Sequence, residues 1–230
     1  MINDFLSLVY PRLCCICKDT ISRNESKWCF KCDLKLPRTS FRTSDTNGAN
    51  PIFQSLTGQW QLNFAISTYY FKKGNTIQKL LHQFKYHGDR EIGQKLGLKM
   101  VESLTDTTDN SAIDYIVPVP LHPSKYALRG FNQAEILANV IADETNSVVI
   151  TNALSRINAT SSQTKKGRYH RWANIDDVFE LNVNNELTGK SVLLVDDVFT
   201  TGATIAGCLT ALSCINNIKI SVITLAYADY

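Results

Sequence analysis

Short hydrophobic runs alternate with amphipathic segments along most of this chain. Runs rich in β-branched and aromatic residues predict strands, and they cover residues 64–71, 113–119, 148–150, 178–181, 192–195 and 218–226. Apolar residues spaced three and four apart predict helices over residues 77–84, 91–104, 134–145 and 205–212. Strands that alternate with helices are typical of the α/β class, so we expect a parallel sheet flanked by helices.

Two stretches interrupt this alternation. Residues 33–62 are polar and irregular, and we interpret them as a linker. Residues 153–174 carry many basic and hydroxyl side chains but few apolar ones, which predicts a loop between two strands. Because long loops in compact domains are usually functional or disordered, we expect this loop to act as a lid over a ligand site. A solvated basic loop without a ligand is the alternative.

The strand over residues 192–195 leads into the most informative segment. Asp196 and Asp197 follow it directly, and Thr200–Thr204 form a Thr/Gly-rich loop that opens the next predicted helix. Ligands of open α/β sheets bind outside the carboxyl ends of the strands. The unpaired N–H groups of a helix start attract phosphate, Thr hydroxyls add donors, and carboxylates accept hydrogen bonds from sugar hydroxyls. This order therefore predicts a sugar-phosphate site.

Other phosphate motifs fit this segment less well. The sequence contains neither the pattern G-x-x-x-x-G-K-[ST] nor the pattern G-x-G-x-x-G after a strand. An ordinary strand–turn–helix is the alternative, because acidic residues are favourable near a helix start. Pro118 and Pro120 end the strand over 113–119, since proline cannot donate to a sheet. We expect the strand ends at residues 116–125 and 195–204 to open on the same side of the sheet.

The cysteines form a separate cluster near the N-terminus. Cys14 and Cys17 make one C-x-x-C pair, and Cys29 and Cys32 make another, a spacing typical of a structural zinc site. So short a segment cannot bury a core of its own, and a metal can supply the missing folding free energy. Four thiolates leave no open position for a catalytic water, and Cys15 is a spare thiol. Disulfide pairing in a secreted domain is the alternative.

Composition narrows the class of protein. The chain has 230 residues, 44% of them hydrophobic and 20% charged, which suits one substantial core with a small appendage. A net charge of +3 does not by itself indicate a nucleic-acid partner. No apolar run approaches the roughly 20 residues of a membrane helix, and residues 1–9 lack the features of a signal peptide. We therefore expect a cytoplasmic protein with no membrane insertion. Cys208 and Cys214 are predicted to pack in the core.

The segment around Asp196 resembles the signature by which type I phosphoribosyltransferases bind phosphoribosyl pyrophosphate (PRPP). The full order of features resembles the ComF (ComFC) family of bacterial competence proteins over about residues 10–230. The features are the cysteine pairs, Lys85–Asp89, Val117–Lys125, Arg129–Glu135, the series Thr160, Gln163, Arg168, Arg171, Asn174 and Phe179, and the PRPP signature. The resemblance implies a zinc knuckle at 1–36, a linker at 37–62 and a type I phosphoribosyltransferase-like domain at 63–230.

The resemblance also implies roles for single residues. Those expected to bind PRPP, with Mg²⁺, are Asp196, Asp197, Thr200, Thr201, Gly202, Ala203 and Thr204. Those expected to face the pyrophosphate or to form the lid are His122, Lys125, Arg129, Arg156, Lys165, Lys166, Arg168 and Arg171. Mg²⁺ and cationic side chains would stabilise the charge on a departing pyrophosphate, and a closed lid would exclude water.

Several features bear on activity. Thr200 stands where some purine-salvage relatives have Asp, and a hydroxyl has no useful pKa for handling a proton of the base, which disfavours ordinary purine salvage. Ile2 follows Met1, and the first 60 residues are too few for a glutaminase domain, which disfavours an amidophosphoribosyltransferase. No segment stands out as a nucleobase pocket. The sequence therefore identifies neither catalytic residues nor the acceptor of a transfer reaction.

The resemblance implies a protein that binds PRPP with Mg²⁺ and takes part in uptake of single-stranded DNA during natural transformation. The alternative is an active phosphoribosyltransferase that transfers ribose 5-phosphate to a nitrogen acceptor in nucleotide metabolism or salvage. Single-stranded DNA could stack on Tyr126, Tyr169 and Trp172, for which core or lid packing is the alternative. A DNA-translocating helicase is a further expected partner, bound by the zinc knuckle.

Overall fold

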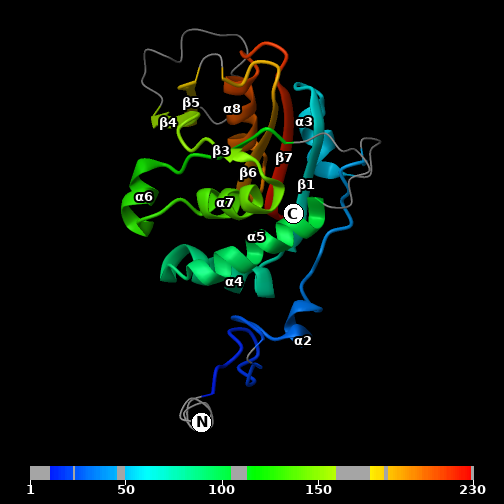
Figure 1. The fold of residues 1–230 in the computed structure, drawn as a ribbon, viewed down its shortest axis with the longest axis vertical. Helices are drawn as coiled ribbons and strands as arrows, with labels where there is room; N and C mark the ends of the chain where they lie inside the picture. Colours follow the sequence, from blue (N-terminus) through cyan, green and yellow to red (C-terminus); the bar gives the residue numbers. More distant parts are fainter. Residues whose placement is uncertain are drawn as a thin grey trace.

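The computed structural model centres on a parallel sheet with helices on both faces (Figure 1). It describes residues 11–22, 24–45, 50–104, 113–158, 177–183 and 186–228. Within these ranges, five strands form the sheet in the order β1-β7-β6-β2-β3, and each neighbouring pair is parallel. They are β1 (Leu62–Phe71), β2 (Tyr115–Pro118), β3 (Val148–Val149), β6 (Ser191–Phe199) and β7 (Lys219–Ala228). The predicted α/β class with a parallel sheet is therefore confirmed.

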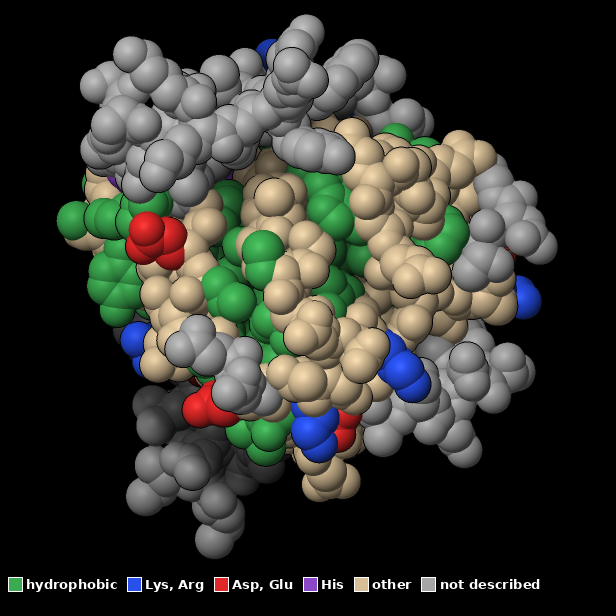
Figure 2. Space-filling view, turned by 90° about the horizontal axis from the view of Figure 1, so that it is seen from above, with side chains coloured by type: hydrophobic (Ala, Val, Ile, Leu, Met, Phe, Trp, Pro, Cys, Tyr) green, Lys and Arg blue, Asp and Glu red, His purple; other side chains and the backbone are tan. Residues whose placement is uncertain are grey.

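Alternate residues of β6 enter two separate hydrophobic cores, as the pleat of a strand requires. Val192 and Leu194 belong to a core shared with α3 and α8, whereas Leu193 and Val195 belong to a core on the opposite face. All four are buried, because a parallel strand inside an α/β sheet is covered on both sides. Seen from above, hydrophobic and uncharged side chains occupy the middle of the surface, and the described charged side chains lie around its rim (Figure 2). The bounds of the two helices are α3, Pro51–Thr57, and α8, Ala203–Leu212.

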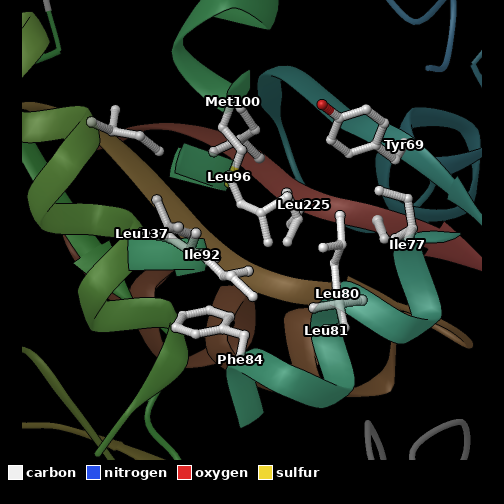
Figure 3. Close-up of a cluster of buried hydrophobic side chains, with 14 of the residues drawn as sticks. Tyr69, Ile77, Leu80, Leu81, Phe84, Ile92, Leu96, Met100, Leu137 and Leu225 are labelled. Carbon is white, nitrogen blue, oxygen red and sulfur yellow. The ribbon is translucent and has the colours of Figure 1, made fainter. Parts of the chain in front are cut away.

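The core on the opposite face lies under three longer helices. Figure 3 shows side chains from several elements pointing toward one another there, among them Leu80, Phe84, Ile92, Leu137 and Leu225. The helices are α4 (Thr76–His87), α5 (Arg90–Leu104) and α7 (Gln133–Thr145). The predicted helices over 77–84, 91–104, 134–145 and 205–212 are thus confirmed as α4, α5, α7 and α8. No helix in the described part of the chain is long and apolar enough to span a membrane.

Two stretches predicted as irregular contain regular structure. Helix α3 lies inside residues 33–62; it starts at Asn50, whose side chain accepts hydrogen bonds from the N–H groups of Ile52 and Phe53, and it packs on β1. Strand β4 (Leu154–Asn158) occupies the start of the predicted lid and pairs antiparallel with β5 (Asp177–Leu181). The predictions of irregular structure were wrong at these places, because α3 is stabilised by the Asn50 cap and by packing on β1, and β4 is stabilised by pairing with β5.

The cysteine knuckle packs on α5 rather than standing apart. Trp28 is fully buried, and its indole N–H donates to Asp33 over 2.8 Å. Lys95 of α5 donates to the carbonyl oxygens of Ser26 and Trp28 at 2.7 and 2.9 Å, and its ammonium lies 4.1 Å from the centre of the indole ring. Lys99 of α5 forms an ion pair with Asp33 at 2.9 Å. The knuckle, with its short helix α2 (Phe30–Asp33), therefore shares the core beneath α5.

Candidate functional site

A cleft opens where β2 and β6 lie side by side, near the register pair Pro118 and Val195. Its lining comes from both strand ends and from the surrounding helices. The lining residues are Lys85, Val119, Pro120, Leu121, Lys125, Arg129, Asn132, Gln133, Arg156, Asp196, Asp197, Val198 and Thr204. The expectation that the two strand ends open on one side of the sheet is therefore confirmed.

The acidic pair lies inside β6, which continues to Phe199, so the prediction that the strand stops before Asp196 was wrong. The extra residues are held because β6 stays paired with β7 as far as Phe199. The backbone N–H of Asp197 donates to Asp196 Oδ1 over 2.8 Å. The ammonium of Lys85, from the last turn of α4, lies 2.8 Å from Asp197 Oδ2. The two carboxylates are thus held together on a rigid strand, with a cation beside one of them.

The environment of Asp196 disfavours its charged form. Burial, followed by the negative charge of Asp197, raises the pKa of Asp196 to about 7. The backbone N–H of Asp197 and the cations of Lys85 and Arg156 act in the opposite direction but are outweighed. Near neutral pH the acidic pair therefore carries a proton part of the time, so its charge is lower than two ionised carboxylates would give.

Substituting Asn for Asp196 should change how stability depends on pH. The native carboxyl keeps its proton up to about pH 7, whereas in the unfolded chain it loses it near pH 4. Its contribution to stability is therefore fully present below about pH 4 and is lost as the pH rises toward about 7. The free energy of unfolding of Asp196→Asn, minus that of the wild type, should rise by on the order of 4 kcal/mol across this range. Urea denaturation of both proteins at several pH values measures it, and a difference that stays constant would contradict the buried state of this carboxyl.

Besides Lys85 of α4, the basic residues of the cleft come from α6 (Pro123–Arg129) and β4. Lys125 and Arg129 lie on α6, and Arg129 donates to Gln133 over 2.8 Å while its guanidinium lies 5.3 Å from the ring centre of Tyr86. The Nε of Arg129 is buried with no hydrogen-bond partner among the described residues. Arg156 lines the cleft from β4, not from a loop as predicted. These residues gather positive charge opposite the acidic pair.

His122 does not line this cleft. It is the N-cap of α6, and its Nδ1 accepts a hydrogen bond from the N–H of Ser124 over 3.2 Å. The predicted lid residues Lys165, Lys166, Arg168 and Arg171 lie outside the described residues, as do Tyr169 and Trp172. Tyr126 is 51% exposed, so packing in the core does not account for it.

The Thr/Gly loop joins β6 to the start of α8, as predicted. Gly202 is the N-cap of α8 with φ +79°, and a Cβ built there would lie 2.7 Å from the ring of Phe199. Both conditions favour glycine. Thr201 Oγ1 accepts a hydrogen bond from the N–H of Ala203 over 3.4 Å. Of the five loop residues only Thr204 lines the cleft; Thr200, Thr201 and Ala203 are exposed beside it.

Three polar residues of the cleft were not among the predicted site residues. Lys85 carried a signal, because it opens the Lys85–Asp89 feature of the ComF resemblance. Asn132 is the N-cap of α7, and its amide also donates to the carbonyl of Val119 over 3.0 Å, which joins the helix to the end of β2. Gln133 is 1% exposed and receives the hydrogen bond of Arg129. Asn132 and Gln133 also carried a signal, because both lie within Arg129–Glu135, another feature of that resemblance.

The four cysteines predicted to bind metal lie together. Their Sγ atoms are all within 4.8 Å of one another, and those of Cys17 and Cys29 are 3.8 Å apart. A tetrahedral ion with Zn–S bonds of about 2.3 Å places its ligands about 3.8 Å from one another. The N–H of Cys29 points at the Sγ of Cys14 over 3.4 Å. Cys14, Cys17, Cys29 and Cys32 can therefore hold a metal ion, whereas Cys15 is not part of the cluster.

The thiol of Cys14 is suited to bind as a thiolate. Burial raises its pKa, but hydrogen bonds from backbone groups at Cys17, Cys29 and Ile16 outweigh burial. The net effect lowers the pKa of Cys14 to about 6. Of the two remaining cysteines, Cys208 is fully buried as predicted. Cys214 is exposed, so its predicted core position was wrong, because it lies just beyond the last buried turn of α8.

Comparisons with known proteins identify relatives of the chain. No protein-family model matches it. It is 27% identical over 204 residues to the DNA utilization protein YhgH of Escherichia coli, covering 87% of this chain and 84% of that protein. It is 30% identical over 147 residues to competence protein F of Haemophilus influenzae, covering 64% of each chain. It is 29% identical over 143 residues to competence protein ComFC of Bacillus subtilis, covering 62% of this chain and 54% of that protein. The resemblance to the ComF family is therefore confirmed.

Phosphoribosyltransferases are among the solved structures to which the chain is similar. One is the purine phosphoribosyltransferase of Pyrococcus horikoshii, with a TM-score of 0.38 and 13% identity, covering 58% of this chain and 80% of that chain. Another is the adenine phosphoribosyltransferase of Trypanosoma brucei in complex with AMP, pyrophosphate and ribose-5-phosphate, with a TM-score of 0.40 and 10% identity, covering 69% and 82%. Neither similarity bears on the ligand of this chain.

Proposed function

We propose that this chain binds a phosphoribosyl diphosphate of the PRPP type in the cleft beside β2 and β6, and that it acts in the uptake or use of DNA in the cytoplasm. One observation carries the ligand: a carboxylate pair faces basic side chains across a cleft that also reaches the start of α8. The DNA role is supported by relatives named competence protein F, ComFC and DNA utilization protein. Cytoplasmic thiols stay reduced, as the cysteine cluster needs.

Each part of PRPP has a matching part of the cleft. Hydroxyls of the ribose would donate to the carboxyl oxygens of Asp196 and Asp197, which accept hydrogen bonds. The 5′-phosphate would lie at the loop before α8, where free N–H groups and the helix dipole favour an anion. The diphosphate would face Lys125, Arg129 and Arg156. Among the described lining residues, four cations stand against two carboxylates, an excess that suits a multiply charged anion.

Magnesium fits this arrangement by the chemistry of its donors. Mg²⁺ prefers carboxylate and phosphate oxygens, and the cleft offers carboxylates next to the proposed position of the diphosphate. When bound, the ion would neutralise charge on the diphosphate. The cysteine cluster needs a softer metal, and its four thiolates suit zinc in a structural role.

Transfer of ribose 5-phosphate to a nitrogen acceptor is the second candidate function. One observation favours it: the pKa of Asp196, raised to about 7, suits a group that takes up or releases a proton near neutral pH. Pyrophosphate release that requires both an acceptor and Asp196 would establish this activity.

The direct test of the ligand is a calorimetric titration of PRPP with Mg²⁺ into the metal-loaded protein. We expect saturable binding of one PRPP per chain, and weaker binding of ribose 5-phosphate, which lacks the diphosphate that the basic side chains would contact. Inorganic phosphate serves as the control for a simple anion. The absence of PRPP binding, or equal affinity for PRPP and inorganic phosphate, would exclude the proposed ligand.

DNA is proposed to bind on the rim of the cleft. Tyr126 on α6 and Tyr86 on α4 are 51% and 55% exposed, and Lys125 and Arg129 lie next to them. Exposed aromatic rings beside cations suit stacking of bases and contact with phosphates. In the same titration a labelled single-stranded oligonucleotide should bind more weakly as salt rises, and Tyr126→Ala should weaken it. If Tyr126→Ala binds the oligonucleotide as tightly as the wild type does, the DNA site does not include Tyr126 and the proposed position on the rim is wrong.

A protein partner is proposed for the knuckle. Phe30 begins α2 and Leu34 is its C-cap, one helical turn later; they are 68% and 70% exposed. Apolar side chains this exposed favour contact with another protein. We propose a DNA-translocating helicase as this partner, in keeping with the DNA role of the relatives.

A further inference from the structure

Lys85 is a cation of the cleft that contacts the acidic pair directly. It stands in the last turn of α4, which ends at Gly88 with φ 63°. Phe84, the residue before it, is fully buried in the core shared with α5, whereas Tyr86, the residue after it, is exposed. The backbone of this turn is therefore held by packing, and the Lys85 side chain is directed into the cleft, where it is a lining residue.

The contact of Lys85 with Asp197 is a shielded ion pair. The two charged atoms are 2.8 Å apart, and the side chains are only 18% and 15% exposed. Ion pairs on open surfaces contribute little, because water and salt screen them, but a pair this shielded holds its geometry more firmly. It also joins α4 to β6, two elements that both contribute lining residues to the cleft.

The pair leaves one oxygen of Asp197 available. Lys85 lies beside Oδ2, and no side chain or backbone group in the described part of the chain hydrogen-bonds to Oδ1. The backbone N–H of Asp197 is itself engaged with Asp196 Oδ1. Because the contact with Lys85 holds the rotation of the carboxylate, Oδ1 can accept a hydrogen bond from a ligand without first reorganising.

We infer that Lys85 is a positioning residue that makes the cleft selective for a ribose, with both ring hydroxyls present, over a deoxyribose. The inference rests on the proposed function, since it concerns the sugar of that same ligand. A shielded carboxylate oriented to accept from a hydroxyl is left unpaired by a sugar that lacks it, and such sites reject the shortened analogue strongly. The sugars of DNA would be disfavoured here for the same reason, so DNA would bind on the rim and not in place of the ribose ligand.

The test compares three sugar phosphates by calorimetry: ribose 5-phosphate, 2-deoxyribose 5-phosphate and 3-deoxyribose 5-phosphate. The wild type should prefer ribose 5-phosphate to at least one deoxy analogue by about tenfold or more, which corresponds to one hydrogen bond to a charged group. Lys85→Met keeps an unbranched side chain only one atom shorter but removes its charge, and it should lose most of this preference. Lys85→Arg should restore part of it.

The matched control is Lys79→Met, an exposed lysine on the same helix, which should behave as the wild type. The inference is overturned if Lys85→Met keeps the wild-type preference. It is also overturned if Lys85→Met loses affinity equally for all three sugars, because Lys85 would then act only as a cation for the phosphate. If the wild type binds PRPP but shows no preference among the three sugars, the inference fails while the proposed function stands. If the wild type binds neither PRPP nor any of the sugar phosphates, the proposed function fails and this inference with it.

Discussion

Replacing Cys29 and Cys32 by serine should remove the bound metal and destabilise the chain well beyond the knuckle. Structural zinc contributes about 10–16 kcal/mol of binding free energy in small zinc domains, comparable to the whole stability of a typical protein, about 5–15 kcal/mol. Here the loss should spread, because Cys14, Cys32 and the fully buried Trp28 belong to the same hydrophobic core as residues of α4, α5 and the sheet. We expect a fall in the free energy of unfolding of at least about 3 kcal/mol.

Two measurements check this result: metal content by mass spectrometry and unfolding by circular dichroism in denaturant. Cys15→Ser is the matched control, since Cys15 lies next to a metal-binding cysteine but outside the cluster, and it should keep both metal and stability. A wild-type protein without metal, or a double variant as stable as the wild type, would show that the four thiols do not hold a structural ion.

The second large effect is expected from changing the acidic pair. Asp196→Asn/Asp197→Asn keeps the shape of both side chains but removes both charges, and it should weaken PRPP binding by about 100-fold or more. Hydrogen bonds to charged groups contribute about 1.5–3 kcal/mol each, and two of them would be lost together with the orienting ion pair to Lys85. Calorimetric titration of PRPP with Mg²⁺ measures the change.

Loss of folding is not expected to explain that result. The folded environment raises the pKa of Asp196 to about 7, so an amide in its place should stabilise the fold near neutral pH. Asp143→Asn, a change at an exposed carboxylate on α7, is the matched control and should bind PRPP as the wild type does. A double variant that binds PRPP with unchanged affinity would place the ligand away from the acidic pair.

Much of the fold could be predicted because its signals are local. The helical spacing of Ile77, Leu80, Leu81 and Phe84 predicts α4 almost to its ends, since an amphipathic face and a C-terminal glycine need no other part of the chain to be recognised. The apolar run before Asp196 likewise predicts a central strand. The predicted end of that strand was wrong, because its pairing with β7 continues through the two charged residues. Strand β4 was not predicted for a similar reason: it is stabilised by pairing with another strand, and its partner β5 is distant in the sequence.

The sequence by itself determined the residue types of both sites. The C-x-x-C pairs place cysteines at metal-binding spacing, and Asp196 and Asp197 precede a loop that requires glycine at residue 202. The residues of each motif lie close together in the sequence, so local geometry is enough to predict the kind of site that they form.

Only the tertiary structure decided which residues meet. It brings Lys85 to Asp197 and Arg156 to the same cleft, and it packs the knuckle on α5 through Lys95. It also directs Lys85 of α4 toward the end of β6, although periodicity alone marks only the buried face of that helix. The physical reason is that such contacts depend on how the two cores hold the helices against the sheet, and that packing depends on the whole chain at once.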